Sequence, residues 1–124
     1  MMAANTAFEA ITKRFAYYAK EPVSKYQAVQ WSTAGDLELA TSGQGPLAGV
    51  VEYGTDKVNE MATVVTGIYP CIAAAPITKG SYIEFAAGKA KSVASGVAYG
   101  IALNDADANT LVGVNIFDAP FTIS

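Results

Sequence analysis

Residues 49–65, GVVEYGTDKVNEMATVV, and residues 100–114, GIALNDADANTLVGV, follow the same pattern and decide the fold class. Each begins with a glycine, continues with a short apolar run, passes through a polar turn that contains Asp56 or Asp107, and returns to a second apolar run. This order is typical of two short strands joined by a turn. No catalytic group recurs in both copies, so the repeat predicts a β scaffold with two similar halves.

The alternation of apolar and polar residues extends over most of the chain from Val23 onward. Val29 and Trp31 alternate with polar neighbours, and Val97, Tyr99 and Ile101 fall on one face of an expected strand. Segments rich in Gly, Pro, Ser and Asn separate the apolar runs, which recur roughly every ten residues. The spacing predicts an all-β fold, a small sandwich or barrel of short antiparallel strands.

Residues 1–25 differ from the rest and are predicted to form an N-terminal arm, with residues 26–124 as the β domain. Thr6 and Glu9 have the spacing of a capping box. Apolar residues then recur at the helical intervals of three and four: Phe8, Ile11, Phe15 and Tyr18. We therefore expect a short amphipathic helix over residues 7–19, which either becomes ordered by packing on a partner or covers the domain's own core.

The composition bounds the class of protein. A chain of 124 residues is expected to form one domain, and 52% apolar residues with only 15% charged residues argue against disorder. The net charge of −3 divides into +2 on residues 1–26 and −5 on the remainder. No basic stripe and no apolar run of membrane-spanning length occurs, so neither a nucleic acid nor a membrane is an expected partner.

The residues that most enzymes use are scarce. The chain has no histidine, which removes the commonest general base and metal ligand. Its single cysteine, Cys71, follows a proline in an apolar stretch and is expected to be a small buried residue. Asp105 and Asp107 lack the partners of a calcium loop and are expected to lie in a turn. We therefore predict no catalytic site, no metal site and no cofactor.

One turn has an alternative interpretation. Asp56-Lys57 lies between two expected strands, as does the modified lysine of lipoyl carrier domains, which residues 52–66 resemble. The second copy has Asp107-Ala108 at the equivalent place. A carrier domain modified at Lys57 is therefore one hypothesis, less favoured than the two functions described next.

Residues 46–117 resemble the small capsid decoration, or cement, proteins of tailed bacteriophages. The resemblance lies in a series of short motifs: Ala48-Gly49-Val50-Val51, Met61–Val65, Gly67, Ile77-Thr78-Lys79-Gly80-Ser81-Tyr82, Gly88-Lys89-Ala90, Tyr99-Gly100-Ile101-Ala102-Leu103 and Val112-Gly113-Val114. In that family the two halves are also similar, and an Ile-Thr-x-Gly turn precedes a strand.

The resemblance implies a non-enzymatic virion structural protein, made in the host cytoplasm. Such a protein binds the outer surface of the phage head and stabilises contacts between major capsid subunits. Its implied partners are the major capsid protein and its own copies, as a homotrimer on the shell. The candidate contacts with the capsid or a neighbouring subunit are Phe8, Ile11, Phe15, Tyr17, Tyr18 and Trp31. Each of the aromatic side chains would contribute about 1.5–3 kcal/mol if fully buried.

The alternative function is a carbohydrate- or host-adhesion module. Trp31 and the seven tyrosines have rings of the kind that stack on sugars. Trp31 is also suited to anchor a core or an interface, and we favour this interpretation over stacking on a sugar.

Overall fold

Nine strands make up the regular structure of residues 9–123, the part of the chain that the computed structural model describes. They are β1 (Ala10–Ala19), β2 (Ala28–Trp31), β3 (Leu37–Leu39), β4 (Leu47–Tyr53), β5 (Glu60–Ile72), β6 (Tyr82–Ala86), β7 (Lys89–Ser92), β8 (Gly96–Ala102) and β9 (Leu111–Ile123). All belong to one mixed sheet, in which only β1 and β3 run parallel. The predicted all-β class is confirmed.

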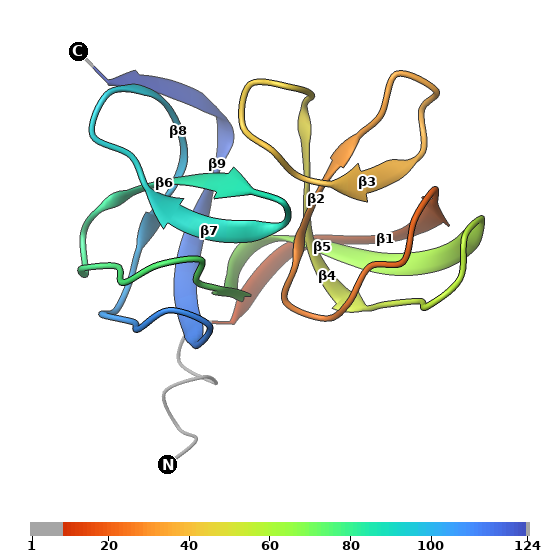
Figure 1. Cartoon of the computed structure of the whole chain (residues 1–124), viewed down its shortest axis with the longest axis horizontal. Coiled ribbons are helices and arrows are strands. Elements are labelled where there is room, and N and C mark those ends of the chain that lie inside the picture. Colours follow the sequence, from red (N-terminus) through yellow and green to blue (C-terminus); the bar gives the residue numbers. More distant parts are fainter. Residues whose placement is uncertain (1–8, 124) are drawn as a thin grey trace.

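The sheet closes on itself twice and forms two lobes (Figure 1). Strands β1, β3, β2, β4 and β5 follow one another in the sheet, and β1 pairs again with β5, which closes the first barrel. Strands β5, β9, β8, β6 and β7 form the second ring, which an isolated bridge between Ala73 and Ala90 closes. The long strand β5 therefore belongs to both barrels. Its first half pairs with β1 and β4 in the first barrel, and its second half pairs with β9 in the second.

The two barrels are copies of one unit, as the two similar halves predicted. The pairings β2–β3, β2–β4 and β4–β5 of the first barrel recur as β6–β7, β6–β8 and β8–β9 in the second. Even the isolated bridges correspond, since Val23–Thr55 matches Ile77–Ala106. The matched residues reveal a second sequence repeat, Ala19-Lys-Glu-Pro-Val-Ser-Lys25 and Ala73-Ala-Ala-Pro-Ile-Thr-Lys79.

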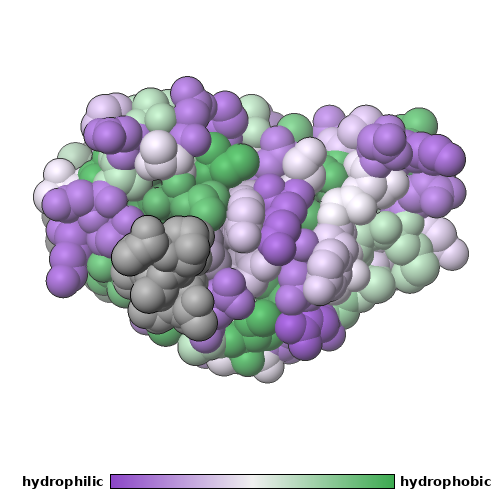
Figure 2. Space-filling view, turned by 90° about the horizontal axis from the view of Figure 1, so that it is seen from below, coloured by the Kyte–Doolittle hydropathy of each residue, from purple (hydrophilic) through white to green (hydrophobic). Residues whose placement is uncertain are grey.

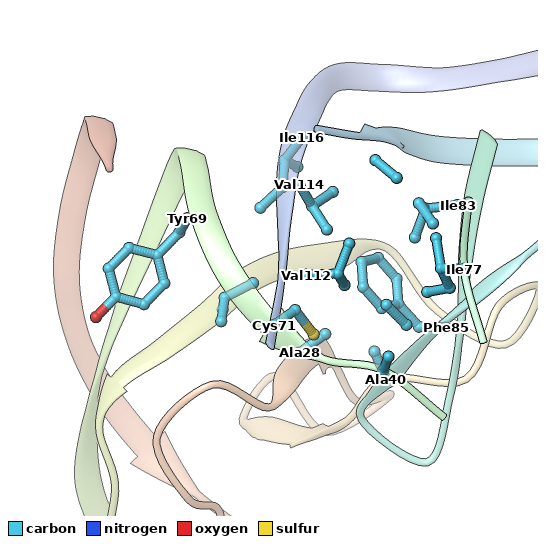
Figure 3. Close-up of a cluster of buried hydrophobic side chains, with 14 of the residues drawn as sticks. Ala28, Ala40, Tyr69, Cys71, Ile77, Ile83, Phe85, Val112, Val114 and Ile116 are labelled. Carbon is cyan, nitrogen blue, oxygen red and sulfur yellow. The ribbon is translucent and has the colours of Figure 1, made fainter. Parts of the chain in front are cut away.

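The cores follow the same correspondence. The first barrel encloses a cluster of fully buried residues that includes Val29, Leu37 and Val64. A larger cluster fills the second barrel, where Ile83, Phe85 and the valines of β9 converge (Figure 3). That cluster also takes in residues of the first barrel: Ala28, Ala40, Val50 and Val65. The two barrels thus share apolar packing as well as strand β5.

The helix expected over residues 7–19 is wrong in the part that the structure describes, because Ala10–Ala19 is strand β1. β1 pairs with β5 from Ala10↔Ile68 to Ala19↔Glu60. A strand satisfies the backbone groups on this edge of β5, which a helix would leave open. The intervals of three and four were misleading, because a β-bulge between Ile11 and Lys13 turns these residues to different sides: Ile11 packs on the core of the second barrel and Phe15 on that of the first.

Whether residues 1–25 form an arm separable from a domain at 26–124 stays a prediction. Within the described residues, Ala19 and Val23 are buried in the core of the first barrel. Strand β1 also contacts β3 through one parallel pair, Ala19↔Leu37. Truncation of the chain at residue 25 tests the proposed boundary.

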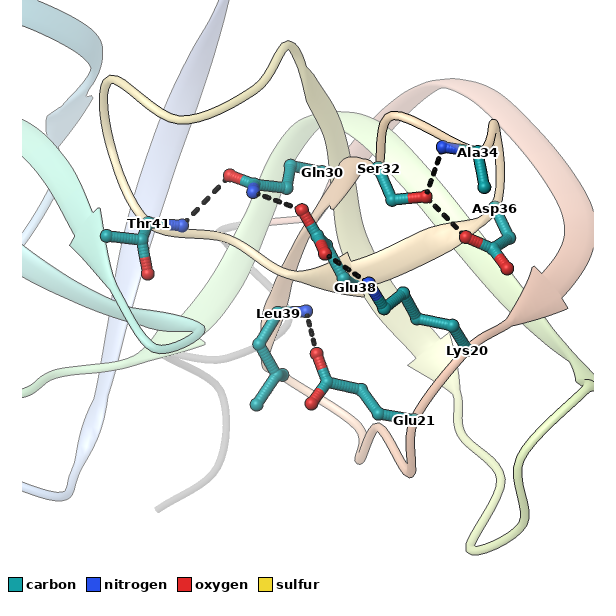
Figure 4. A network of polar contacts seen from close by, with 9 residues as sticks. All are labelled: Lys20, Glu21, Gln30, Ser32, Ala34, Asp36, Glu38, Leu39 and Thr41. Carbon is teal, nitrogen blue, oxygen red and sulfur yellow. Dashed lines mark hydrogen bonds and ion pairs between the residues drawn. The ribbon is translucent and has the colours of Figure 1, made fainter.

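A polar network stabilises the narrow seam between β1 and the β2–β3 hairpin (Figure 4). The buried Gln30 donates its amide to Glu38 Oε2 at 2.6 Å and accepts the N–H of Thr41 at 3.0 Å. Lys20 Nζ lies 3.2 Å from Glu38 Oε1, and Glu21 Oε2 accepts the N–H of Leu39 at 2.8 Å. The Gln30 hydrogen bond, followed by that from Lys20, lowers the pKa of Glu38. Side-chain hydrogen bonds and an ion pair thus help to hold β1 against β3, with which it shares only the pair Ala19↔Leu37.

Candidate docking surface

The structure brings together four of the six predicted contact residues. Phe15 of β1 stacks on Trp31 of β2, with ring centroids 5.6 Å apart and an interplanar angle of 17°. Tyr17 meets Trp31 edge-on at 5.6 Å, and Tyr18 meets Tyr17 edge-on at 5.7 Å. Because β1 and β2 are not neighbours in the sheet, closure of the barrel places these rings side by side. The aromatic cluster, as we call Phe15, Tyr17, Tyr18 and Trp31, is therefore a product of the fold.

The other two predicted residues lie apart from the aromatic cluster or outside the described region. Ile11 is half-buried and packs against the core cluster of the second barrel. Its position therefore favours a role in packing within the chain. Phe8 lies outside the described residues.

Part of the aromatic cluster continues into an exposed strip on the outside of the first barrel. Tyr18 is 52% exposed and pairs with Met61 of β5, which is also 52% exposed. Tyr53 of β4, 64% exposed, pairs with Thr63, two residues farther along β5. We call Tyr18, Met61 and Tyr53 the outer strip. The sequence analysis missed Met61 and Tyr53, because a single sequence does not show which face of a two-sided barrel strand stays uncovered.

The inner side of the aromatic cluster borders a cleft of about 720 Å³ between the two barrels. Phe15 and Trp31 line it from the first barrel, and Tyr99 and Phe117 line it from the second. Phe15 stacks on Trp31, so the indole packs within the chain at the wall of the cleft. This arrangement supports the interpretation of Trp31 as an anchor more than as a platform for a sugar.

One ion pair lies near the outer strip. Arg14 donates from Nε to Glu52 Oε1 at 2.7 Å and from Nη2 to Glu52 Oε2 at 2.9 Å, a bidentate pair. Glu52 is only 8% exposed, and its hydrogen bond with Arg14 lowers its pKa, against the opposing effect of burial. Lys25 Nζ lies 5.9 Å from the ring centre of Tyr53, within reach of a cation–π interaction.

The lowered pKa of Glu52 predicts a loss of stability in acid. A carboxyl group whose pKa is lower in the folded state stabilises the fold above its unfolded pKa, and this contribution disappears as the pH falls through the folded value. We expect Glu52→Gln to lower the free energy of unfolding at pH 7 and to reduce its fall between about pH 5 and pH 2. Urea titrations across this range measure both effects.

The Arg14 partner supplies the control for this experiment. In an Arg14→Gln background the bidentate pair is already lost, so adding Glu52→Gln should change the acid dependence much less. An equal change in both backgrounds would contradict the assigned cause.

Neither Cys71 nor Asp105 has the surroundings of a reactive group. Burial raises the pKa of the Cys71 thiol to about 12, which keeps it protonated and unreactive at neutral pH. Asp105 Oδ1 accepts the N–H of Lys79 at 2.7 Å and so fixes a turn. Lys57 is exposed in the turn between β4 and β5. Within residues 9–123, no three His, Cys, Asp or Glu side chains gather as metal ligands would.

The face of the molecule seen from below carries small hydrophobic areas interrupted by hydrophilic residues, outside the part covered by grey atoms (Figure 2). Over the described range, no helix is long and apolar enough to cross a membrane. The exposed apolar side chains that stand out are on the first barrel, in the outer strip and the adjoining Tyr17 and Val58, with Val97 and Phe121 on the second.

Comparison with known proteins connects this fold to a phage structure. No family model matches the chain, and no curated protein matches its sequence. Among solved structures, the chain is similar to the N base of the head fiber gp8.5 of bacteriophage phi29, with a TM-score of 0.71 and 21% sequence identity. The similarity covers 90% of this chain and 98% of that chain. The chain therefore shares its overall fold with that structure over nearly the whole length of both.

Proposed function

We propose that this protein is a non-enzymatic structural component of a bacteriophage virion that binds the outside of the head. The observation that carries the proposal is the shared fold with a head fiber base, which spans nearly the whole of both chains. The motifs that resemble capsid decoration proteins lead independently to the same class of protein. The major capsid protein is the proposed partner, and stabilisation of contacts between its subunits is the proposed effect.

The outer strip is the proposed contact with the capsid. Tyr18, Met61 and Tyr53 are each more than half exposed and lie on adjacent strands of a closed barrel, so the backbone beneath them is rigid. Large apolar side chains presented on a rigid surface are typical of residues that dominate binding energy. Copies of the protein bound to one shell would strengthen one another by multivalency, and a homotrimer is the proposed assembly.

Binding to heads tests the proposal directly. Purified protein mixed with expanded heads of its own virus that lack it should sediment with the heads at saturable stoichiometry. The double variant Tyr18→Ser, Met61→Ser should bind at least about tenfold more weakly, because burial of each side chain contributes about 1.5–3 kcal/mol. A titration of bound against free protein measures the change.

Val97→Ser is the matched control, because Val97 is an exposed apolar residue of the second barrel, at 39%. It should bind heads as the unaltered protein does. Absence of binding by the unaltered protein would refute the proposed function, whereas equal weakening by the control would refute only the assignment of the outer strip.

The two alternative functions have their own tests. A carbohydrate-adhesion module would give saturable signals on a glycan array that Trp31→Ala abolishes. A carrier domain would show the added mass of a lipoyl or biotinyl group on Lys57 after expression in a host that attaches them. We favour neither, because Trp31 packs within the chain and the second copy of the turn has Ala108 in place of the lysine.

A further inference from the structure

The second barrel presents a hairpin that docks on the first barrel. Figure 1 shows the β6–β7 hairpin reaching toward the first lobe. At its tip, Gly88 O accepts the N–H of Ala28 at 2.7 Å, and Gly88 N donates to Ala40 O at 2.8 Å. Gly88 is buried, and a Cβ added to it would lie 2.9 Å from Leu39 Cδ2. Within the chain, Gly88 at the hairpin tip is therefore held by the first barrel, while Ala87 beside it stays exposed.

The equivalent hairpin of the first barrel has no such cover. In the duplicated unit, the β2–β3 hairpin matches β6–β7, and Gly35 matches Gly88, with φ angles of +91° and +84°. Gly35 is exposed, and a Cβ added to it would meet no atom within 4 Å. The same structural element is thus covered in one barrel and bare in the other.

The duplication also identifies the residue equivalent to the one that packs on the docked hairpin tip. Tyr17 on β1 matches Cys71 on β5, given the matched pairs Tyr18↔Met61 and Ile72↔Leu111. Cys71 is fully buried, and its Sγ lies 3.8 Å from Gly88 O. Tyr17 is 43% exposed. We call Tyr17, Ala34 and Gly35 the hairpin surface.

The surface that receives the hairpin within the chain also has a counterpart that is only partly covered, by Phe121, whose ring stacks on Tyr82 with centroids 5.5 Å apart. Ala28 and Ala40, which bond to Gly88, are 0% and 2% exposed. Ala40 N donates to Ala28 O at 3.0 Å, and Val93 N donates to Tyr82 O at the same distance, so Tyr82 and Val93 match them. Both counterparts are only half-buried. We call Tyr82 and Val93, which are larger and apolar, the receiving surface.

We propose that copies of this chain associate head to tail, with the hairpin surface of one copy docked on the receiving surface of the next. The two surfaces belong to one chain, and their counterparts already bind each other within it, which identifies a second copy as the partner. Such a contact is heterologous, so it either closes into a ring or extends as an open chain, which leaves one free surface on each terminal copy. This inference deepens the self-association in the proposed function and needs no capsid.

Complementation between two variants tests the arrangement. The unaltered protein should have a weight-average mass in sedimentation velocity that rises with concentration to at least twice the 12.9 kDa of one chain. Tyr17→Arg removes the hairpin surface and Val93→Arg removes the receiving surface, so each variant alone should stay monomeric. An equimolar mixture should form dimers and nothing larger, because each variant retains the surface that the other lacks.

Val58→Arg is the control, because Val58 is 58% exposed in the β4–β5 turn and belongs to neither surface. It should assemble normally. Should Tyr17→Arg show an altered circular dichroism spectrum, Ala34→Arg at the exposed hairpin tip replaces it. A monomeric unaltered protein, or a mixture that stays monomeric, would overturn the proposal.

Head-to-tail association and capsid binding are tested by independent measurements, so either proposal can be refuted without the other. Sedimentation of the free protein reports on head-to-tail association alone. The outer-strip variant Tyr18→Ser, Met61→Ser should still self-associate while binding heads weakly.

Discussion

Gly49→Ala should destabilise the protein by about 3 kcal/mol or more, one of the largest effects expected of a single added methyl group. Gly49 has φ +149°, a conformation that L-residues rarely adopt. A Cβ at this position would overlap the carbonyl oxygen of Val65 and lie 2.8 Å from Val64 Cγ1. The carbonyl belongs to β5, which both barrels share, so it has little freedom to move. Thermal denaturation should show a melting temperature at least about 10 °C lower.

Gly80→Ala is the matched control for this change. Gly80 also has a positive φ, +89°, but no atom lies within 4 Å of an added Cβ. Its counterpart in the first barrel is Tyr26, which has φ +73° and a full side chain. The control should therefore cost only about 1 kcal/mol. Equal losses for the two variants would show that backbone conformation, and not the approach of β5, makes Gly49 necessary.

The same close approach explains the opening glycine of each sequence copy. A Cβ on Gly100 would lie 2.7 Å from Asn115 O and 2.7 Å from Val114 Cγ1, in the contact that corresponds to that of Gly49. The repeat at residues 49–65 and 100–114 could be predicted because it lies within hairpins, where local spacing determines pairing. The fold class and the two similar halves followed from it.

The full duplication was also present in the sequence, at residues 19–31 and 73–85. Each copy has Ala-x-x-Pro, a β-branched aliphatic residue, Ser or Thr, and Lys, and then a strand in which Trp31 and Phe85 occupy equivalent positions. The alternation of Val29 and Trp31 with polar neighbours indicated a strand, but its match with residues 82–85 was not recognised. The β2–β3 turn has one residue more than the β6–β7 turn, so the spacing between the copies changes after Trp31, and this repeat does not align in one frame with that at residues 49–65 and 100–114.

What the sequence does not reveal is the sharing of β5. A strand of 13 residues that leaves one barrel at Gly67 and enters another depends on contacts distant in sequence, such as Ile68↔Ala10 and Ile68↔Asn115. Local periodicity does not identify pairing partners that are distant in the sequence. The same limit applies to the site: the aromatic residues of β1 were identified, but their contact with Trp31 and the continuation to Met61 depend on closure of the barrel.

Removal of residues 1–25 should unfold both barrels, even though it deletes strand β1 of only one. β1 covers one edge of β5 from Glu60 to Ile68 and contributes the fully buried Ala19 to the first core. Without it, Ala62 and Val64 of β5 face solvent. Because the second half of β5 also closes the second barrel against β9, loss of order in β5 propagates there. An arm that is separable, as the sequence predicted, would instead leave residues 26–124 folded.

Hydrogen exchange of the amides in β9 distinguishes these outcomes, because β9 lies in the barrel that the deletion does not touch. We expect the truncated chain to lose the protection of β9 and to show no cooperative thermal transition. Two point variants locate the cause within β1: Ala19→Arg, at a fully buried site, should reproduce the loss, whereas Ala16→Arg, exposed on the same strand, should not. Protection of β9 that survives both the truncation and Ala19→Arg would mean that the two barrels fold independently, and that β5 joins them without coupling their stability.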